Sequence, residues 1–246
     1  RAEDMDAFIR TVTAACDFVK AKKRSKKTIN LSFDEWNVWF HSKSEEEDIT
    51  TNHPWQVAPH LLEDHYNFED ALMVGLMMIT LLRHADRVKI ACLAQLVNVI
   101  APVMTETDGC AWRQTIYYPF LHASKYGRGT VLELLTDSPS HQTKEHGEVS
   151  DIVAVSVFNE EKEELAIFAV NRNLEEDIEL TVDVRSFEGY KPQEQIVLAC
   201  DDLKAENRAA GEKVAPVQKP CGKAEDGFLT TVLGKASWNV IRLVRS

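Results

Sequence analysis

The sequence predicts a protein of two parts, an α/β part in residues 1–126 and an all-β part in residues 127–246. The first part alternates helix and strand patterns, which is typical of parallel strands joined by crossover helices. The second part has short strand-like runs between turn-rich segments, which is typical of an antiparallel β-sandwich. Because two strands cannot form a sheet with both faces covered, we expect the first part to be the edge of a larger barrel or incomplete.

The α/β part contains five segments with distinct patterns. Apolar residues spaced at i, i+3, i+4 and i+7 predict an amphipathic helix near the start. Asn67 and Asp70 predict the capped start of a second helix that is apolar almost all round. In chain order we expect a helix over residues 4–20, a strand over 28–33, a polar loop over 41–66, a helix over 68–84 and a strand over 87–94.

A loop over residues 104–110 and a helix over residues 112–125 precede the all-β part. Trp112 and Arg113 are expected to begin this helix, with a place at the edge of a binding cleft as the alternative. Trp238 is expected to be a core residue, so the sandwich is predicted to be structural. Its strands are expected at residues 131–135, 152–157, 165–170, 178–184, 195–198 and 238–244.

Composition indicates an ordinary globular protein, with 44% hydrophobic and 27% charged residues. The net charge of −11 disfavours a nucleic-acid partner. The longest apolar run begins at residue 71 and is too short to span a membrane, so we interpret it as a buried helix and exclude a membrane protein. The five cysteines form no Cys-x-x-Cys pair, which indicates reduced thiols and a cytoplasmic location.

A carboxylate, an amide and two indoles follow the first predicted strand. Glu35 lies two residues beyond Phe33, at the carboxyl end of the strand, and this end faces the active site in parallel α/β barrels. Trp36 and Trp39 offer apolar faces for a sugar ring, while Asn37 can bond its hydroxyls. The pattern indicates carbohydrate chemistry. The structural alternative is a buried acid satisfied by backbone N–H groups, beside core tryptophans.

Three stretches resemble glycoside hydrolase family 51, whose members are mainly α-L-arabinofuranosidases. Residues 32–40 (SFDEWNVWF) resemble the nucleophile motif of the family, and residues 94–102 (AQLVNVIAP) and 112–120 (WRQTIYYPF) strengthen the match. Fainter similarity continues from residue 168 to the C-terminus. The resemblance implies the last part of a (β/α)8 TIM barrel, containing strands seven and eight, followed by a C-terminal antiparallel β-sandwich.

The resemblance also implies a retaining double displacement with Glu35 as the nucleophile. In the family the general acid/base lies in an Asn-Glu pair at the end of strand four, and no such pair precedes Glu35 here. Retaining chemistry needs two carboxyl groups roughly 5–5.5 Å apart. We therefore expect the acid/base on an upstream segment, as part of a longer polypeptide, because the chain opens at Arg1 without a methionine. Glu106 and Asp108 are the local alternative.

Three more residues receive roles from the resemblance. Gln95 matches a glutamine that bonds sugar hydroxyls in the donor subsite, with a capped strand end as its structural alternative. Trp39 matches an aromatic residue on the leaving-group side. Asn37 and Asp34 are expected to hold Glu35 in place, with plain turn formation as the alternative.

Four histidines fall in the predicted loop over residues 41–66, near Glu63 and Asp64. Their spacings match no compact metal-ligand pattern, and carboxylates alone can perform glycoside hydrolysis. We therefore predict no metal and no cofactor. The four histidines are His41, His53, His60 and His65.

The predicted function is the release of terminal α-L-arabinofuranosyl residues from arabinoxylan or arabinan oligosaccharides, a step in hemicellulose degradation and L-arabinose metabolism. The alternatives are a family member that acts on β-glucan or xylo-oligosaccharides, and a non-catalytic fragment or assembly module. The expected partners are the oligosaccharide, the upstream barrel segment and further copies in a homo-oligomer, for which the family suggests a hexamer. No nucleic-acid or membrane partner is expected.

Overall fold

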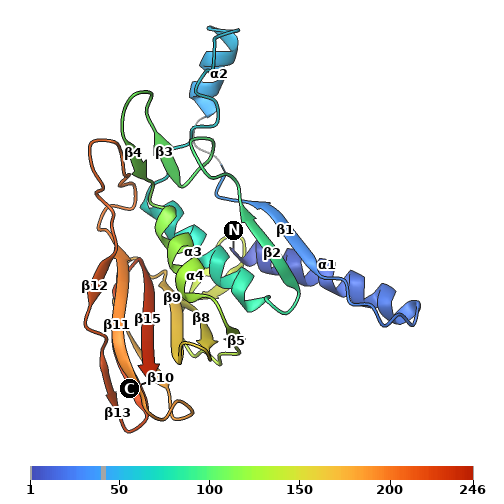
Figure 1. The fold of residues 1–246 in the computed structure, drawn as a ribbon, viewed down its shortest axis with the longest axis vertical. Helices are drawn as coiled ribbons and strands as arrows, with labels where there is room; N and C mark the ends of the chain where they lie inside the picture. The colour runs from blue at the N-terminus through green and yellow to red at the C-terminus, as the bar shows by residue number, and fades with distance from the viewer. Residues whose placement is uncertain (1, 40–42, 246) are drawn as a thin grey trace.

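The computed structural model describes residues 2–39 and 43–245 (Figure 1). Its α/β part is built on a parallel pair of strands, β1 (Leu31–Trp36) and β2 (Val88–Leu93), joined through helix α3 (Phe68–Arg83). The predicted parallel pair with a crossover helix is therefore confirmed. The first strand begins and ends three residues later than the predicted strand over residues 28–33. Glu35 therefore lies within β1 rather than beyond it.

The all-β part is an antiparallel sandwich, as predicted. Its larger sheet has six strands in the order β12-β11-β15-β9-β8-β5, and its smaller sheet has three in the order β10-β14-β13. The bounds in the larger sheet are β5 (Thr130–Leu132), β8 (Ile152–Asn159), β9 (Glu164–Asn171), β11 (Tyr190–Ala199), β12 (Val217–Lys219) and β15 (Ser237–Arg245). The smaller sheet contains β10 (Ile178–Asp183), β13 (Lys223–Glu225) and β14 (Phe228–Leu233), and a separate hairpin pairs β6 (Ser140–Thr143) with β7 (Gly147–Ser150).

The larger sheet is covered on both faces. All eight residues of its central strand β9 are buried, and the six apolar residues at positions 165–170 alternate between two apolar clusters. Phe168 and Val170 pack towards α3, whereas Ile167 and Ala169 pack towards the smaller sheet. The apolar run at positions 165–170 is therefore continuous because both faces of β9 are buried.

Helix α3 lies between the two parts of the molecule. Leu72, Leu76 and Ile79 pack on the sandwich, while Val74 and Met77 pack on the β1–β2 side. This double contact explains why the helix is apolar on nearly every face. The predicted capping is confirmed at its start, where the Asn67 side chain accepts from the Asp70 N–H and the Asp70 carboxylate accepts from the Asn67 N–H.

Trp238 of β15 is fully buried where the larger sheet packs against α3 and helix α4 (Tyr117–Tyr126), which confirms its prediction as a core residue. Its indole N–H donates to Nδ1 of the buried His122 at 3.0 Å. Its ring also lies against Gly75, where an added Cβ would come within 2.6 Å of ring atom Cε3. Only glycine lets the backbone of α3 approach the sheet this closely.

We expect stability to fall on acidification because of His122. Burial, followed by the charge of Lys125, lowers the pKa of His122 to about 4 from 6.5. Below pH 6.5 the unfolded chain binds a proton that the folded chain does not, so the free energy of unfolding drops by about 2 kcal/mol between pH 7 and pH 5. Urea unfolding at both pH values measures this drop. His122→Asn, which keeps an acceptor without a titrating ring, should show a smaller drop, and an equal drop would contradict the assignment.

Three local predictions were wrong, two for loops and one for the start of a helix. The loop over residues 41–66 contains helix α2 (Lys43–Thr51), and residues 104–110 belong largely to a hairpin of β3 (Val103–Thr105) and β4 (Ala111–Arg113). Trp112 and Arg113 are thus strand residues, and α4 begins only at Tyr117. The reason is tertiary, because residues 111–113 pair with residues 103–105 and the Gln114 N–H continues this contact to the Pro102 carbonyl.

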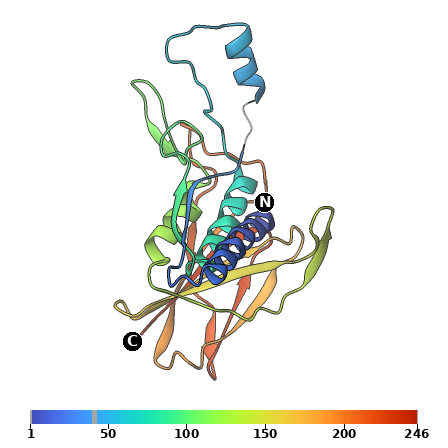
Figure 2. The ribbon, with the colours of Figure 1, turned by 90° about the vertical axis from the view of Figure 1, so that its right-hand side faces the viewer.

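Helix α1 (Ala2–Lys22) confirms the predicted amphipathic helix, but little of its apolar side is covered. Met5 and Ile9 are buried, whereas Phe8 and Phe18 are 60% and 66% exposed. The helix begins beside α3 and extends away from the rest of the molecule in Figure 1, whereas Figure 2 views it nearly along its axis. None of the helices in the described ranges is long and apolar enough to cross a membrane.

Candidate functional site

A register shift at the end of β1 turns two acidic residues away from the core. Phe33 pairs with Ala91 and Trp36 with Leu93, so β1 uses three residues where β2 uses two. Phe33 and Trp36 both pack in the cluster beneath the strands, while Asp34 and Glu35 are exposed. An irregularity of this kind re-aims side chains at a strand end, and alternation alone could not have revealed it.

Asn37 joins the ends of the two parallel strands. Its Nδ2 donates to the carbonyls of Ala94 and Ile100, each at 2.7 Å, and its Oδ1 accepts from the Val38 N–H at 2.8 Å. Ala94 and Ile100 bound the segment after β2 that contains Gln95. The Asn37 side chain therefore fixes this segment against the segment that follows Glu35.

Gln95 is exposed and lies two residues beyond the end of β2. Its backbone N–H donates to the Ile100 carbonyl at 3.1 Å, which closes the loop between them, and the Ala94–Gln95 peptide is cis. Since Trp36 pairs with Leu93, Glu35 and Gln95 come from neighbouring strand ends. Sequence reasoning anticipated this neighbourhood from the parallel strands.

The two tryptophans near Glu35 differ sharply in exposure. Trp36 is buried against α3 as part of the core, so it is not available as a ring platform, and the structural alternative is correct for this residue. Trp39 is 59% exposed and lies after the strand, three residues beyond its end. Of the two indoles, only Trp39 offers a face to a ligand.

A buried glutamine and tyrosine support the strand ends, and sequence reasoning did not single them out as functional. The Gln114 side chain accepts from the Tyr66 N–H at 2.9 Å and donates to the carbonyls of Asp64 and Ala101, each at 2.8 Å. The Tyr66 hydroxyl donates to the Val38 carbonyl at 3.2 Å. Burial raises the pKa of Tyr66, so the phenol keeps its proton and remains a donor. The sequence signal that could have identified Gln114 is its position as a polar residue within the motif of residues 112–120.

The remaining predicted site residues lie elsewhere. Glu106 and Asp108 are exposed in the turn of the β3–β4 hairpin. Arg113 forms an ion pair with Glu212 at 2.7 Å, which joins β4 to the loop before β12. His60 bonds Glu63 at 2.8 Å, and no group of potential metal ligands gathers in the described residues. His41 lies outside those residues.

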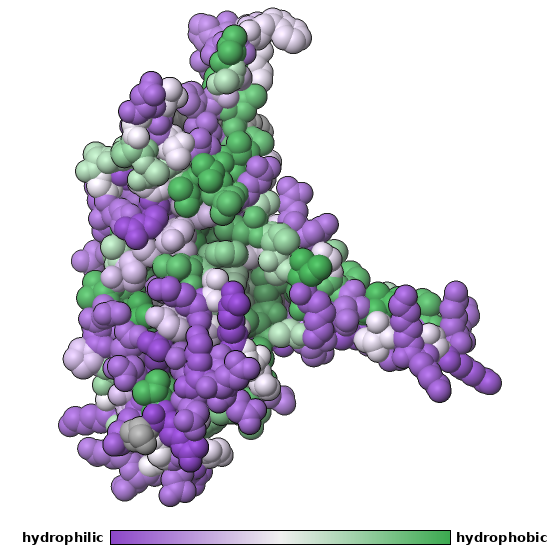
Figure 3. Space-filling view, viewed as in Figure 1, coloured by the Kyte–Doolittle hydropathy of each residue, from purple (hydrophilic) through white to green (hydrophobic). Residues whose placement is uncertain are grey.

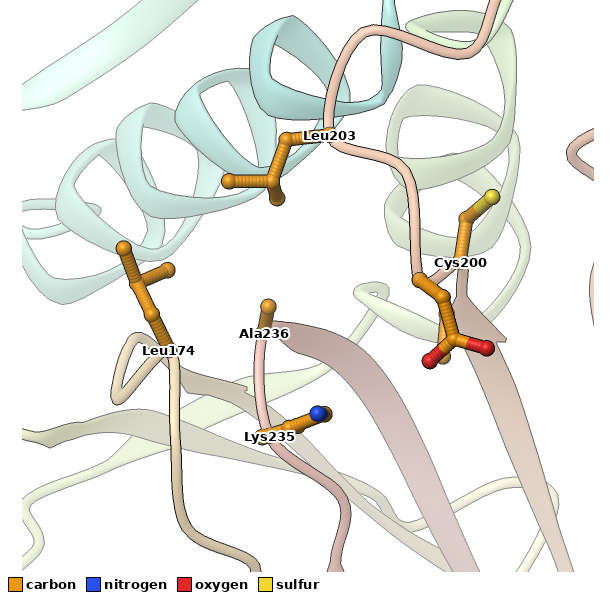
Figure 4. A pocket seen from close by; sticks show the side chains of 7 residues that line it. Leu174, Cys200, Leu203, Lys235 and Ala236 are labelled. Atoms are coloured by element: carbon orange, nitrogen blue, oxygen red, sulfur yellow. The ribbon is translucent and has the colours of Figure 1, made fainter.

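Five pockets in the described part of the chain lie on or beside the sandwich, and Glu35 lines none of these five. The pocket of Figure 4 has a volume of about 300 Å³ and lies below α3, where Leu174, Leu203 and Ala236 point towards a common space beside Cys200 and Lys235. The surface near the strand ends is open instead. Figure 3 shows hydrophobic side chains gathered there and towards α1, and the exposed apolar residues include Phe8, Phe18, Ile90, Leu96 and Val97.

Comparison with known proteins shows which family this arrangement belongs to. Residues 34–237 match the family model described as the α-L-arabinofuranosidase C-terminal domain. A protein from Acetivibrio thermocellus, named intracellular exo-α-(1→5)-L-arabinofuranosidase, is 60% identical over 99% of this chain and 48% of its own length. A relative of the same name from Bacillus subtilis is 52% identical, also over 99% of this chain and 48% of its own length.

Solved structures agree with these relatives. A family 51 α-L-arabinofuranosidase from Bifidobacterium longum is 38% identical, with a TM-score of 0.88 over 98% of this chain and 48% of its own. The arabinose complex of a Thermotoga maritima α-L-arabinofuranosidase has the same fold at 22% identity, with a TM-score of 0.79 over 98% of this chain and 48% of its own. This chain spans about half the length of the curated relatives it matches. It belongs to glycoside hydrolase family 51 and corresponds to the C-terminal part of the family's arabinofuranosidases.

Proposed function

We propose that this chain carries the nucleophile of a retaining exo-α-L-arabinofuranosidase. The observation that carries the proposal is the position of Glu35, which is exposed at the carboxyl end of β1 beside the segment that contains Gln95. A parallel α/β barrel places its reacting groups at this end of its strands. Family membership supplies the reaction class, and the exposed Trp39 lies close in sequence for contact with the leaving group.

The reaction takes two steps. In the first, a Glu35 oxygen bonds to the anomeric carbon while the glycosidic bond breaks, and an acid protonates the leaving oxygen. In the second, water loses a proton to the same acid/base group and attacks the anomeric carbon. Arabinose leaves with retained configuration and the Glu35 carboxylate is restored. Gln95 bonds hydroxyls of the sugar in the donor subsite. Asn37 holds the segment that contains Gln95 against the segment that follows Glu35. No cofactor takes part.

The acid/base belongs to an upstream segment that completes the (β/α)8 barrel. In this arrangement β1 and β2 are strands seven and eight, residues 1–126 are barrel, and residues 127–246 form a structural sandwich. The exposed apolar side chains of Phe8, Ile90 and Leu96 support this completion, because a partner segment would cover them. Glu106 and Asp108 are less suitable, since they lie on a hairpin turn rather than at a strand end.

The substrates we propose are arabinan and arabinoxylan oligosaccharides with terminal α-L-arabinofuranosyl groups. The A. thermocellus and B. subtilis relatives are named for the α-(1→5) linkage, whereas a B. longum relative 40% identical to this chain is named for the α-(1→6) linkage. We therefore propose α-(1→5) as the preferred linkage. The relatives' names also support a cytoplasmic location, and the family resemblance supports a hexameric homo-oligomer.

The test of this function is a panel of aryl glycosides given to the chain alone and to the chain joined to its upstream half. We expect the joined protein to cleave the α-L-arabinofuranoside, and the chain alone to be inactive because it lacks the acid/base. Aryl β-glucosides and β-xylosides are the matched comparison. Preferential cleavage of either would replace the proposed specificity, and activity of the chain alone would refute the upstream acid/base. A joined protein inactive on every glycoside would indicate a non-catalytic module.

A further inference from the structure

Behind the two strand ends, four hydrogen bonds and the peptide bonds between neighbouring residues form a closed ring, which we call the amide ring. After β1, the Asn37 side-chain amide donates to the Ile100 carbonyl. The carbonyl of the following residue, Ala101, accepts from the Gln114 side-chain amide, and the Gln114 side-chain oxygen accepts from the Tyr66 N–H. The Tyr66 hydroxyl donates to the Val38 carbonyl, in the segment that follows Glu35. Its members are Asn37, Val38, Tyr66, Ile100, Ala101 and Gln114.

The side-chain amide of Gln114 accepts one hydrogen bond and donates two, all with backbone groups. Its side chain is fully buried, and its three hydrogen bonds reach three backbone groups in two segments that are distant in sequence, Asp64–Tyr66 and Ala101. Only a primary amide can donate twice and accept once from one planar group. Removing the Gln114 amide takes one hydrogen-bond partner from each of three buried backbone groups, and these groups would be expected to shift towards water or towards another partner.

The amide ring connects to both proposed catalytic segments. On one side it holds the backbone at Val38, three residues after Glu35. On the other it holds Ile100 and Ala101, and the Ile100 carbonyl also accepts from the Gln95 N–H. A displacement at Gln114 would therefore change the position of Glu35 relative to Gln95 without either residue being altered.

We propose that Gln114 is a positioning residue for the arabinofuranosidase reaction, acting through the amide ring on Glu35 and Gln95. This inference rests on the proposed function. Gln114 does not contact the sugar, since its polar atoms are occupied by the backbone. Its contribution is therefore to the transition state, where the distance from the Glu35 oxygen to the anomeric carbon is decisive.

The chain provides a matched control in Gln195 of β11. This glutamine is also buried and also makes three hydrogen bonds, to the Val232 carbonyl, the Asn239 side chain and the Thr231 hydroxyl, but it lies within the sandwich. Gln114→Met and Gln195→Met remove the same polar groups at similar volume. Any loss caused only by unsatisfied buried groups should affect both variants alike.

The experiment measures kcat and KM for an aryl α-L-arabinofuranoside with the joined full-length protein, normalised to the folded fraction by circular dichroism. We expect Gln114→Met to lower kcat by about 10–100-fold with KM changed less than about threefold, and Gln195→Met to keep kcat within about twofold. An unchanged kcat in Gln114→Met, or equal losses in both variants, would overturn the inference. An inactive parent protein would instead overturn the proposed function.

A second variant covers the case in which Gln114→Met does not fold. Tyr66→Phe removes the hydrogen bond from the Tyr66 hydroxyl to the Val38 carbonyl and keeps the aromatic ring in the core. We expect it to fold and to lower kcat several-fold, again with little change in KM. A kcat equal to that of the parent would overturn the inference that the amide ring positions Glu35 through Val38.

Discussion

Glu35→Gln is expected to reduce hydrolysis of an aryl α-L-arabinofuranoside by on the order of 10³-fold or more. The amide keeps the size and hydrogen-bonding reach of the side chain but cannot form the covalent glycosyl ester, so the first step fails. The rate of aryl-group release by the joined full-length protein, under saturating substrate, measures the effect.

Asp34→Asn is the matched control for Glu35. Both carboxylates are exposed, lie side by side in β1 and turn away from the core. Because Asp34 is proposed only to support its neighbour, its neutral variant should lose far less activity than Glu35→Gln. Activity that survives in Glu35→Gln, or a larger loss in Asp34→Asn, would refute Glu35 as the nucleophile. Glu106→Gln in the same assay tests the local alternative for the acid/base.

Trp238→Ala is expected to lower the free energy of unfolding by about 3–5 kcal/mol. The indole is fully buried, its ring centroid lies 5.7 Å from that of Phe168, and its N–H bonds His122. Its removal leaves a cavity between α3 and the larger sheet and an unpaired imidazole, and neither element can collapse without losing other contacts. Urea unfolding followed by circular dichroism measures the change.

Trp55→Ala provides the comparison for Trp238, because Trp55 is 99% exposed. Truncation of an exposed side chain away from such features usually changes stability within about 0.5 kcal/mol. A loss below about 1 kcal/mol in Trp238→Ala, or a similar loss in both variants, would show that this part of the core is not rigidly packed.

Local sequence patterns predicted the elements whose stabilisation is local or repetitive. The capped start of α3 was predictable because Asn67 and Asp70 satisfy backbone groups only three residues apart. The strands β8, β9 and β15 were predictable because a run of apolar β-formers has no stable solvent-exposed conformation. The hairpin of β3 and β4 was not predictable from local patterns. Each strand has only three residues, which is too short for a strand pattern, and each is stabilised by pairing with the other.

The candidate site divides in the same way. The sequence by itself indicated that Glu35 and Gln95 belong to the carboxyl ends of two parallel strands, because strand patterns and motif spacing are properties of the chain. Only the tertiary structure decided that Trp36 belongs to the core while Glu35 turns outward, through the register shift between β1 and β2. It alone assembled the amide ring, because hydrogen bonds between residues 13 to 63 positions apart depend on packing that no local pattern encodes.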